Sequence, residues 1–395
     1  MDTTNAQNGR SGISGAGPLP VQTPTLSPVN VVNDIIRGVV PMNGVTLPCL
    51  AIFEPWICQG FASTKNLRAE TLYNEVTFMA SMETSAAIHL LSDLRDKWIA
   101  KQTIMDIKKL GLNAVKLKVG YWLVEGSNSK FADAKKYVDN VMRWAEEYNI
   151  GVYLSLAAVP GCQNLQPVAN CPNDKLDWTL DGNIKRTVEI IKAIATEYKK
   201  FKSFLALSLI YEPTERGIDN RKLEYLYNTV IQDLQVQGFD RLIMISPLLE
   251  RRFNVDDAKF WCEFALARRN VAISISSYLY WDLLETEEKI TTEVKKRGDF
   301  LKANLKCPIV VDEWSMATRL DLTPEQRVTL AENQRMAYGA ARNGSFYGPF
   351  QTSFLQDKYD GFSYKSQVDF KIIKVDTTKG KLPPVTNDMN TMLAP

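Results

Sequence analysis

The stretches FLALSLIYEP, residues 204–213, and CPIVVDEWS, residues 307–315, decide how this chain folds. Each is a continuous apolar run, the pattern of a strand that is covered on both faces of its sheet. A glutamate closes each run, Glu212 in the first and Glu313 in the second. In a barrel of parallel strands the C-terminal strand ends carry the chemistry, so both glutamates are candidate catalytic residues.

Six further runs of the same kind complete a set of eight. The eight runs cover residues 49–54, 114–120, 151–158, 204–212, 241–247, 271–279, 307–313 and 344–350. Stretches with apolar residues at helical spacing lie between them, at 131–149, 184–200 and 221–237. The alternation predicts an α/β fold, a single (β/α)8 TIM barrel, with Glu212 and Glu313 at the ends of its fourth and seventh strands.

A further helix is predicted just before the last run. Thr323 is a candidate N-cap, Pro324 suits the first helical position, and Gln326 completes a capping box. Asn343-Gly344 predicts the C-terminal stop of this helix. The eighth strand is the weakest element, because GSFYGPF contains Gly348 and Pro349.

Both ends of the chain differ in composition from the predicted barrel, which takes residues 32–375. Residues 1–31 are rich in Gly, Ser, Thr, Pro and Asn and predict an extended low-complexity arm, and residues 376–395 form a similar tail. Spaced apolar residues in the arm, which include Val31 and Val32, could anchor it on a neighbouring copy. We therefore expect a homo-oligomer or polymer, the alternative being an arm that folds back and plugs its own barrel.

Composition excludes several classes of partner. The 395 residues contain 47 Lys and Arg against 45 Asp and Glu, and a net charge of +2 predicts neither nucleic acid nor an anionic membrane as partner. No apolar run is long enough to span a bilayer. The first residues have neither a basic start nor an apolar core, so the expected location is cytoplasmic.

Cysteine and histidine usage indicates neither a metal site nor a cofactor. The six cysteines contain no CxxC pair, and the single histidine is His89. Free, mostly buried thiols are the expectation, with a Cys162–Cys171 bridge left open.

Short motifs in a fixed order, from about Gly38 to about Val368, resemble glycoside hydrolase family 5, and most closely its fungal exo-β-1,3-glucanase branch. The matching runs are GVTL at 44–47 for GVNL, FEPWI at 53–57 for LEPWI, GLNAVKLKVGYW at 111–122 for GLNHVRIPVGYW, and LAAVPGCQN at 156–164 for LHGAPGSQN. YEP at 211–213 stands for the family's NEP, and DEWS at 312–315 for its GEWS.

The resemblance implies a retaining hydrolase of β-glucan or a glucoside, in which Glu212 is the acid/base and Glu313 the nucleophile. One carboxyl must hold its proton while the other is ionised, so the two need unequal environments. The positions that would bind the sugar are Glu54, Lys116, Tyr211, Tyr278 and Trp281.

Several of the polar groups that surround the two glutamates in the family are changed here. Lys116 replaces an arginine, Ala157 and Ser276 replace histidines, and Tyr211 replaces the asparagine of NEP. The tryptophan-rich FWTWK run reads YGPFQ at 347–351. Losing one preorganised polar group commonly costs about 10²–10³ in rate, and here several have changed together. Lys116 could instead form a structural ion pair with Glu313.

Two functions fit these observations. The first is a pseudoenzyme, a glucanase-like barrel that has lost hydrolysis and serves as a self-associating structural or scaffold protein. The second is an active retaining β-glucosidase or exo-β-1,3-glucanase with a rebuilt site. We expect the first, with a pocket that is altered or partly closed because Tyr211 is much larger than asparagine.

Overall fold

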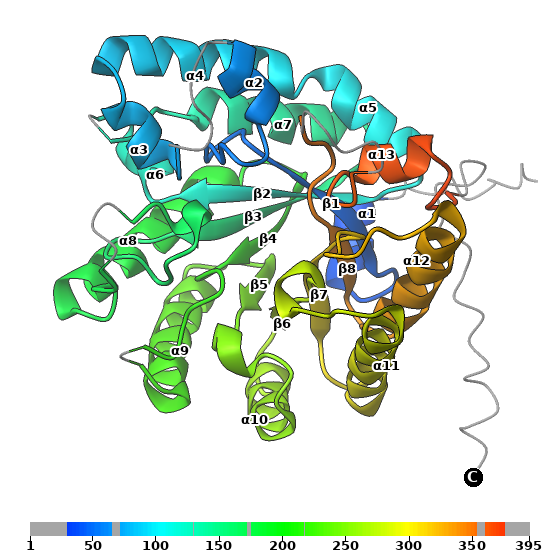
Figure 1. Ribbon diagram of the computed structural model, residues 1–395. Coiled ribbons are helices and arrows are strands. Elements are labelled where there is room, and N and C mark those ends of the chain that lie inside the picture. The colour runs from blue at the N-terminus through cyan, green and yellow to red at the C-terminus, as the bar shows by residue number, and fades with distance from the viewer. Residues whose placement is uncertain are drawn as a thin grey trace, which may run out of the picture.

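The computed structural model describes residues 30–64, 72–128, 130–171, 175–216, 218–353 and 360–375, and these form one (β/α)8 barrel. Eight parallel strands follow one another around a closed barrel in sequence order, as Figure 1 shows. The strands are β1 (Met42–Leu47), β2 (Ala114–Gly120), β3 (Gly151–Ala158), β4 (Phe204–Ser208), β5 (Leu242–Ile245), β6 (Val271–Ser276), β7 (Ile309–Trp314) and β8 (Gly344–Tyr347). The predicted fold is confirmed.

Helices cover the outside of the barrel (Figure 1). The longer ones are α4 (Thr84–Trp98), α5 (Lys101–Lys109), α7 (Lys135–Glu147), α8 (Asp181–Tyr198), α9 (Asn220–Val236), α10 (Val255–Leu266), α11 (Glu287–Ala303) and α12 (Pro324–Tyr338). Shorter elements are α1 (Val31–Ile36), α2 (Gln59–Thr64), α3 (Glu75–Ala80), α6 (Trp122–Glu125), α13 (Tyr364–Asp369) and the 3₁₀ turns η2 (Pro167–Ala169), η3 (Leu249–Arg251) and η4 (Tyr280–Asp282). The main hydrophobic core lies between these helices and the strands.

The predicted start of α12 is confirmed, but its predicted end is wrong. Thr323 and Gln326 form the reciprocal capping box, with Pro324 in the first turn. The helix ends at Tyr338, and Gly344 starts β8 instead, with a φ of 93°. A Cβ on Gly344 would lie 1.8 Å from the carbonyl oxygen of Met42, so only glycine fits at this point of the barrel.

The first predicted strand, 49–54, is also wrong. The strand is β1, Met42–Leu47, and the run after it is a loop in which Cys49 has a left-handed φ of 59°. This loop is apolar because it is buried beneath α3 and α4, where Phe53 packs against Phe78 with ring centroids 4.9 Å apart. Burial alone therefore explains a pattern that was interpreted as a strand.

Helix α1 covers the N-terminal ends of the strands. Its Val32 and Ile35 pack against Met42, Ala114 and Leu205, each at or near the start of its strand. Val31 and Val32, predicted as anchors toward another copy, thus belong to a plug of the chain's own barrel. The rest of the predicted arm, residues 1–29, and the tail 376–395 lie outside the described residues.

The expectation of free thiols is wrong, since all six cysteines form disulfides. The pairs are Cys49–Cys58, Cys162–Cys171 and Cys262–Cys307. The sequence left open only the Cys162–Cys171 disulfide, because the pairing of cysteines cannot be deduced from their spacing alone. Among the described helices, none has the length and apolar character needed to cross a membrane.

Candidate active site

A bulge in β7 turns two consecutive carboxylates toward the barrel interior. In the register with β6, Ile275 lies opposite Val311 and Ser276 opposite Glu313, so Asp312 is the extra residue. Asp312 and Glu313 are 2% and 1% exposed. Without the bulge, neighbouring strand residues would point to opposite faces of the barrel wall.

The Glu313 carboxylate is surrounded by the protein's own polar groups. Thr46 donates to Oε1 at 2.9 Å. The hydroxyls of Tyr211 and Tyr278 donate to Oε2 at 2.7 and 3.0 Å. With the ammonium of Lys118 at 3.2 Å from Oε2, these contacts occupy most of the acceptor positions that a carboxylate has.

Two lysines of β2 supply the compensating charge. The Lys116 ammonium lies 2.5 Å from Asp312 Oδ2 and 3.6 Å from Glu313 Oε1, so the ion pair with Glu313 expected from the sequence is present, and Asp312 is the closer partner. The Lys118 ammonium lies between Glu313 and Glu54, 3.7 Å from Glu54 Oε1. Three carboxylates and two ammonium groups thus form one network, which is buried except for Lys118, whose side chain is 11% exposed.

This network separates the pKa values of Glu313 and Glu54. Burial raises the pKa of the Glu313 carboxyl, but Lys116 and Lys118, together with the bonds from Tyr211 and Thr46, outweigh it and lower the pKa to about 2. Burial raises the pKa of Glu54, and the charge of Glu313 adds to that effect, whereas Lys118 opposes it. Glu313 therefore stays ionised across the physiological range.

Glu212 lies beyond the end of β4 in a strained backbone conformation. Its φ is 48°, in the left-handed region that residues with a side chain seldom adopt. Asn164 holds the Glu212 carbonyl oxygen at 2.8 Å, and Gln166 donates to the carboxylate Oε2 at 2.8 Å. A strained backbone conformation persists only where the surrounding structure enforces it. Such conformations are typical of functional positions.

Tyr211 fills the space beside Glu313. Its ring is 2% exposed, packs in a cluster with Trp122 and Phe131, and lies 4.5 Å from the Lys116 ammonium. Burial raises the pKa of the Tyr211 hydroxyl well above its ordinary value, and the neighbouring carboxylates of Glu212 and Glu313 raise it further. The hydroxyl therefore keeps its proton and remains a donor to Glu313.

Comparison with known proteins shows what this chain is similar to. The chain is 24% identical to glucan 1,3-beta-glucosidase 2 of Schizosaccharomyces pombe over 309 residues, which cover 74% of this chain and 53% of that protein. It is 24% identical to a probable glucan 1,3-beta-glucosidase A of Aspergillus clavatus over 311 residues, 77% of this chain and 71% of that protein. The chain thus spans about half the length of the fission yeast relative. The chain is thus similar to glucan 1,3-beta-glucosidases, in agreement with the resemblance of its motifs to glycoside hydrolase family 5.

Solved structures share the fold of this glucanase-like barrel. Rutinosidase from Aspergillus niger superposes with a TM-score of 0.70 at 14% identity, covering 85% of this chain and 98% of that one. A second structure, AoRut, gives a TM-score of 0.71 at 14% identity, covering 84% and 96%. No protein-family model matches the chain.

The glucanase-like barrel brings most of the predicted site residues together. Glu54, Lys116, Tyr211 and Tyr278 belong to the network or contact around Glu313 described above. Trp281, in contrast, is 58% exposed on η4 and pairs with Tyr280 at 4.7 Å between ring centroids. It therefore lies at the surface, outside the buried group.

Residues of the site that were missed from the sequence include Thr46, Asp312, Lys118 and Gln166. Lys118 follows Lys116 at the two-residue spacing that places both on one face of a strand, a signal that could have predicted it. Gln166 lies in an irregular loop, and no local pattern relates it to Glu212, 46 positions away.

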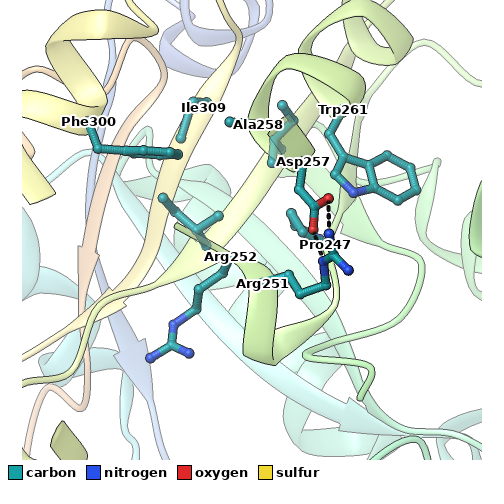
Figure 2. Close-up of a pocket in the computed structure, with 10 residues that line it drawn as sticks. Pro247, Arg251, Arg252, Asp257, Ala258, Trp261, Phe300 and Ile309 are labelled. Carbon is teal, nitrogen blue, oxygen red and sulfur yellow. Dashed lines mark hydrogen bonds and ion pairs between the residues drawn. The ribbon is translucent and has the colours of Figure 1, made fainter. Parts of the chain in front are cut away.

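A small cavity of about 10 Å³, room for about one water molecule, lies elsewhere, between α10 and the strands beside it (Figure 2). Its walls include Trp261, Ile273 and Ile309, and Arg251 pairs with Asp257 at its edge. None of the predicted site residues lines it.

Proposed function

We propose that this chain is a glucanase-like barrel in which the ancestral site no longer hydrolyses glucosides. The observation that supports the proposal is the 2.7 Å hydrogen bond from the Tyr211 hydroxyl to Glu313 Oε2. In a retaining hydrolase the nucleophile attacks the anomeric carbon, so a sugar ring must come into contact with it. A sugar would therefore compete with the Tyr211 hydroxyl for this carboxylate.

The contacts of Glu313 leave little room for a substrate as well. Two ammonium groups and three hydroxyls surround the carboxylate, and they keep it ionised by lowering its pKa. A substrate would have to displace Tyr211, a ring that is 2% exposed and packed among aromatic neighbours.

The second candidate is an active retaining β-glucosidase or exo-β-1,3-glucanase. It is favoured by the curated relatives, which are named as glucan 1,3-beta-glucosidases, and by the presence of both glutamates at the strand ends. In that function Glu313 would be the nucleophile and Glu212 the acid/base, and Tyr211 would have to move on binding.

The experiment is an assay of the purified chain on an aryl β-glucoside and on laminarin, beside Glu313→Gln, Glu212→Gln and Tyr211→Asn. Covalent trapping with a 2-deoxy-2-fluoro β-glucoside, read by intact mass, reports whether Glu313 reacts at all. We expect neither turnover nor a mass increase in the unmodified chain. Turnover that Glu313→Gln abolishes would refute the proposal and establish the second candidate.

A structural or scaffold role through self-association remains our proposal for what the barrel does in place of hydrolysis. Its predicted arm lies almost entirely in residues 1–29, outside the described residues. Light scattering on the whole chain and on a chain without residues 1–29 tests it, because α1 then stays in place as the barrel plug. An unchanged monomeric mass in both would refute the assembly role.

The cellular location also remains a proposal. The sequence led us to expect the cytoplasm, but three disulfides are typical of an oxidising compartment, since cytosolic thiols are kept reduced. We therefore propose that the chain folds in an oxidising compartment.

A further inference from the structure

Two of the three disulfides enclose loops that follow barrel strands at the site. Cys49–Cys58 follows β1, and Cys162–Cys171 follows β3; in each pair the cysteines are nine positions apart. The third disulfide links Cys262 in α10 to Cys307, which lies two residues before β7. Cys307 is therefore at the opposite end of that strand from Glu313.

The first loop carries Glu54 to the buried network. Glu54 lies inside the Cys49–Cys58 loop, and its Oε1 is 3.7 Å from the Lys118 ammonium. The backbone closes around it, because the amides of Ile57 and Cys58 donate to the Glu54 carbonyl oxygen at 3.0 and 3.3 Å. The position of the Glu54 carboxyl is thus set by the conformation of this short loop.

The second loop holds the segment that contains Tyr211 and Glu212. Gln163 donates its side-chain amide to the Tyr211 carbonyl oxygen at 3.1 Å, and its own carbonyl accepts from the Thr214 amide at 3.1 Å. Asn164 holds the Glu212 carbonyl oxygen, and Gln166 its carboxylate, each at 2.8 Å. Four hydrogen bonds from one closed loop therefore fix the strained segment.

The backbone of each loop is itself held in an uncommon conformation. Cys49 has a φ of 59° and Cys162 a φ of 60°, values in the left-handed region that favours glycine. Neither Cys262 nor Cys307 has a positive φ. A conformation of this kind persists only where the surrounding structure enforces it, and a cross-link at the same residue supplies such a constraint.

We propose that Cys49–Cys58 and Cys162–Cys171 are positioning elements of the site, whereas Cys262–Cys307 stabilises only the barrel wall. The first fixes Glu54 against Lys118, and the second fixes Gln166 against Glu212. The proposal concerns the geometry of the carboxylates and holds whether or not the site hydrolyses glucosides, so it can fail independently of the proposed function.

The test compares three paired variants of the whole chain: Cys49→Ser with Cys58→Ser, Cys162→Ser with Cys171→Ser, and Cys262→Ser with Cys307→Ser. Carboxylates are labelled with a carbodiimide and an amine, and the label at Glu54, Glu212 and Asp312 is quantified by peptide mass spectrometry. Thermal unfolding of the same samples measures the general loss of stability that removing any disulfide causes.

We expect each labelled carboxylate to respond to one pair alone. Replacing Cys49 and Cys58 raises labelling at Glu54 several-fold, and replacing Cys162 and Cys171 raises labelling at Glu212 several-fold. Replacing Cys262 and Cys307 lowers the unfolding temperature without raising the labelling of Glu54 or Glu212. Asp312, buried against Lys116, stays unlabelled in all three. Gln166→Ala leaves every disulfide intact and is expected to raise labelling at Glu212 alone. It serves as the test of the second loop if the variant without Cys162 and Cys171 does not fold.

Equal labelling in all three folded variants would overturn the proposal, because a purely structural role predicts a common effect. A Gln166→Ala chain whose Glu212 stays as protected as in the unmodified protein would overturn it for the second loop.

Discussion

The hydroxyl of Tyr211 and the carboxylate of Glu313 are joined by a 2.7 Å hydrogen bond between residues 102 positions apart in the chain. Tyr211 precedes Glu212, so the two glutamates of the site are connected through one side chain. An asparagine at 211 would be too short to fill the same space. The tyrosine at this position therefore both donates to the buried carboxylate and occupies the room beside it.

Removing this hydroxyl is expected to cost stability. Tyr211→Phe keeps the ring and leaves Glu313 short of one charge-assisted bond, a loss of about 2 kcal/mol for a buried bond to a charged group. Urea unfolding measures it, with Tyr225→Phe, whose side chain is 76% exposed, as the control that leaves the midpoint unchanged. Equal midpoints for both variants would show that the bond contributes nothing.

Lys116 is expected to be the most sensitive position of the network. Lys116→Met keeps the length of the side chain but leaves Asp312 and Glu313 buried beside one another with less compensating charge. Breaking a buried ion pair by removing one partner costs about 3–5 kcal/mol. The matched control is Lys136→Met, which removes an exposed lysine paired with Asp96 and should change the unfolding midpoint little. A variant at 116 as stable as this control would contradict the role of the buried pair.

Glu313 is expected to make stability fall in acid. Its pKa is about 2 in the folded chain against an ordinary 4.5, so its ionised form contributes stability that is fully present above pH 4.5. That contribution, of about 3 kcal/mol, is lost as the pH falls from about 4.5 through about 2. Glu54 acts in the opposite direction, because its pKa is raised on folding, so its contribution to stability is present at low pH and is lost as the pH rises.

The measurement is the free energy of unfolding from pH 6 to pH 2 for the unmodified chain and Glu313→Gln, in which the slope should be smaller. Glu197→Gln is the control, since the pKa of Glu197 is also lowered to about 2, first by its bond to Lys200 and then by Lys135. The Glu197 side chain is 37% exposed, so its effect should weaken in high salt, whereas the effect of the buried Glu313 should persist. Identical slopes for the unmodified chain and Glu313→Gln would contradict the prediction.

The sequence predicted the barrel because most strands coincide with apolar runs. β1 was missed for a physical reason: MNGVTL contains Asn43 and Gly44, and its Thr46 is polar because it faces Glu313. The more apolar run after it is buried by helices without being a strand. Apolar character reports burial, and burial is shared by strands and by loops that lie beneath helices.

The two glutamates were predictable because strand ends are visible in the sequence, but their surroundings were not. The contacts of Lys116 with Asp312 and of Gln166 with Glu212 join residues 196 and 46 positions apart. Side-chain direction at a bulge decides which of Asp312 and Glu313 a lysine reaches, and no bulge is apparent in the run itself.

The three disulfides can be checked by thiol titration, and both their positioning role and the proposed oxidising compartment depend on them. All six cysteines of the chain are paired, so protein unfolded without reductant should react with a thiol reagent at none of them, and at all six after reduction. Peptide mapping of the unreduced protein should recover Cys49 with Cys58 and Cys162 with Cys171. Protein purified from an oxidising compartment and titrated at once is the sample to use, because thiols oxidise slowly in air. Six reactive thiols in that sample would contradict all three disulfides, and would leave the loops around Glu54 and Glu212 held by hydrogen bonds alone.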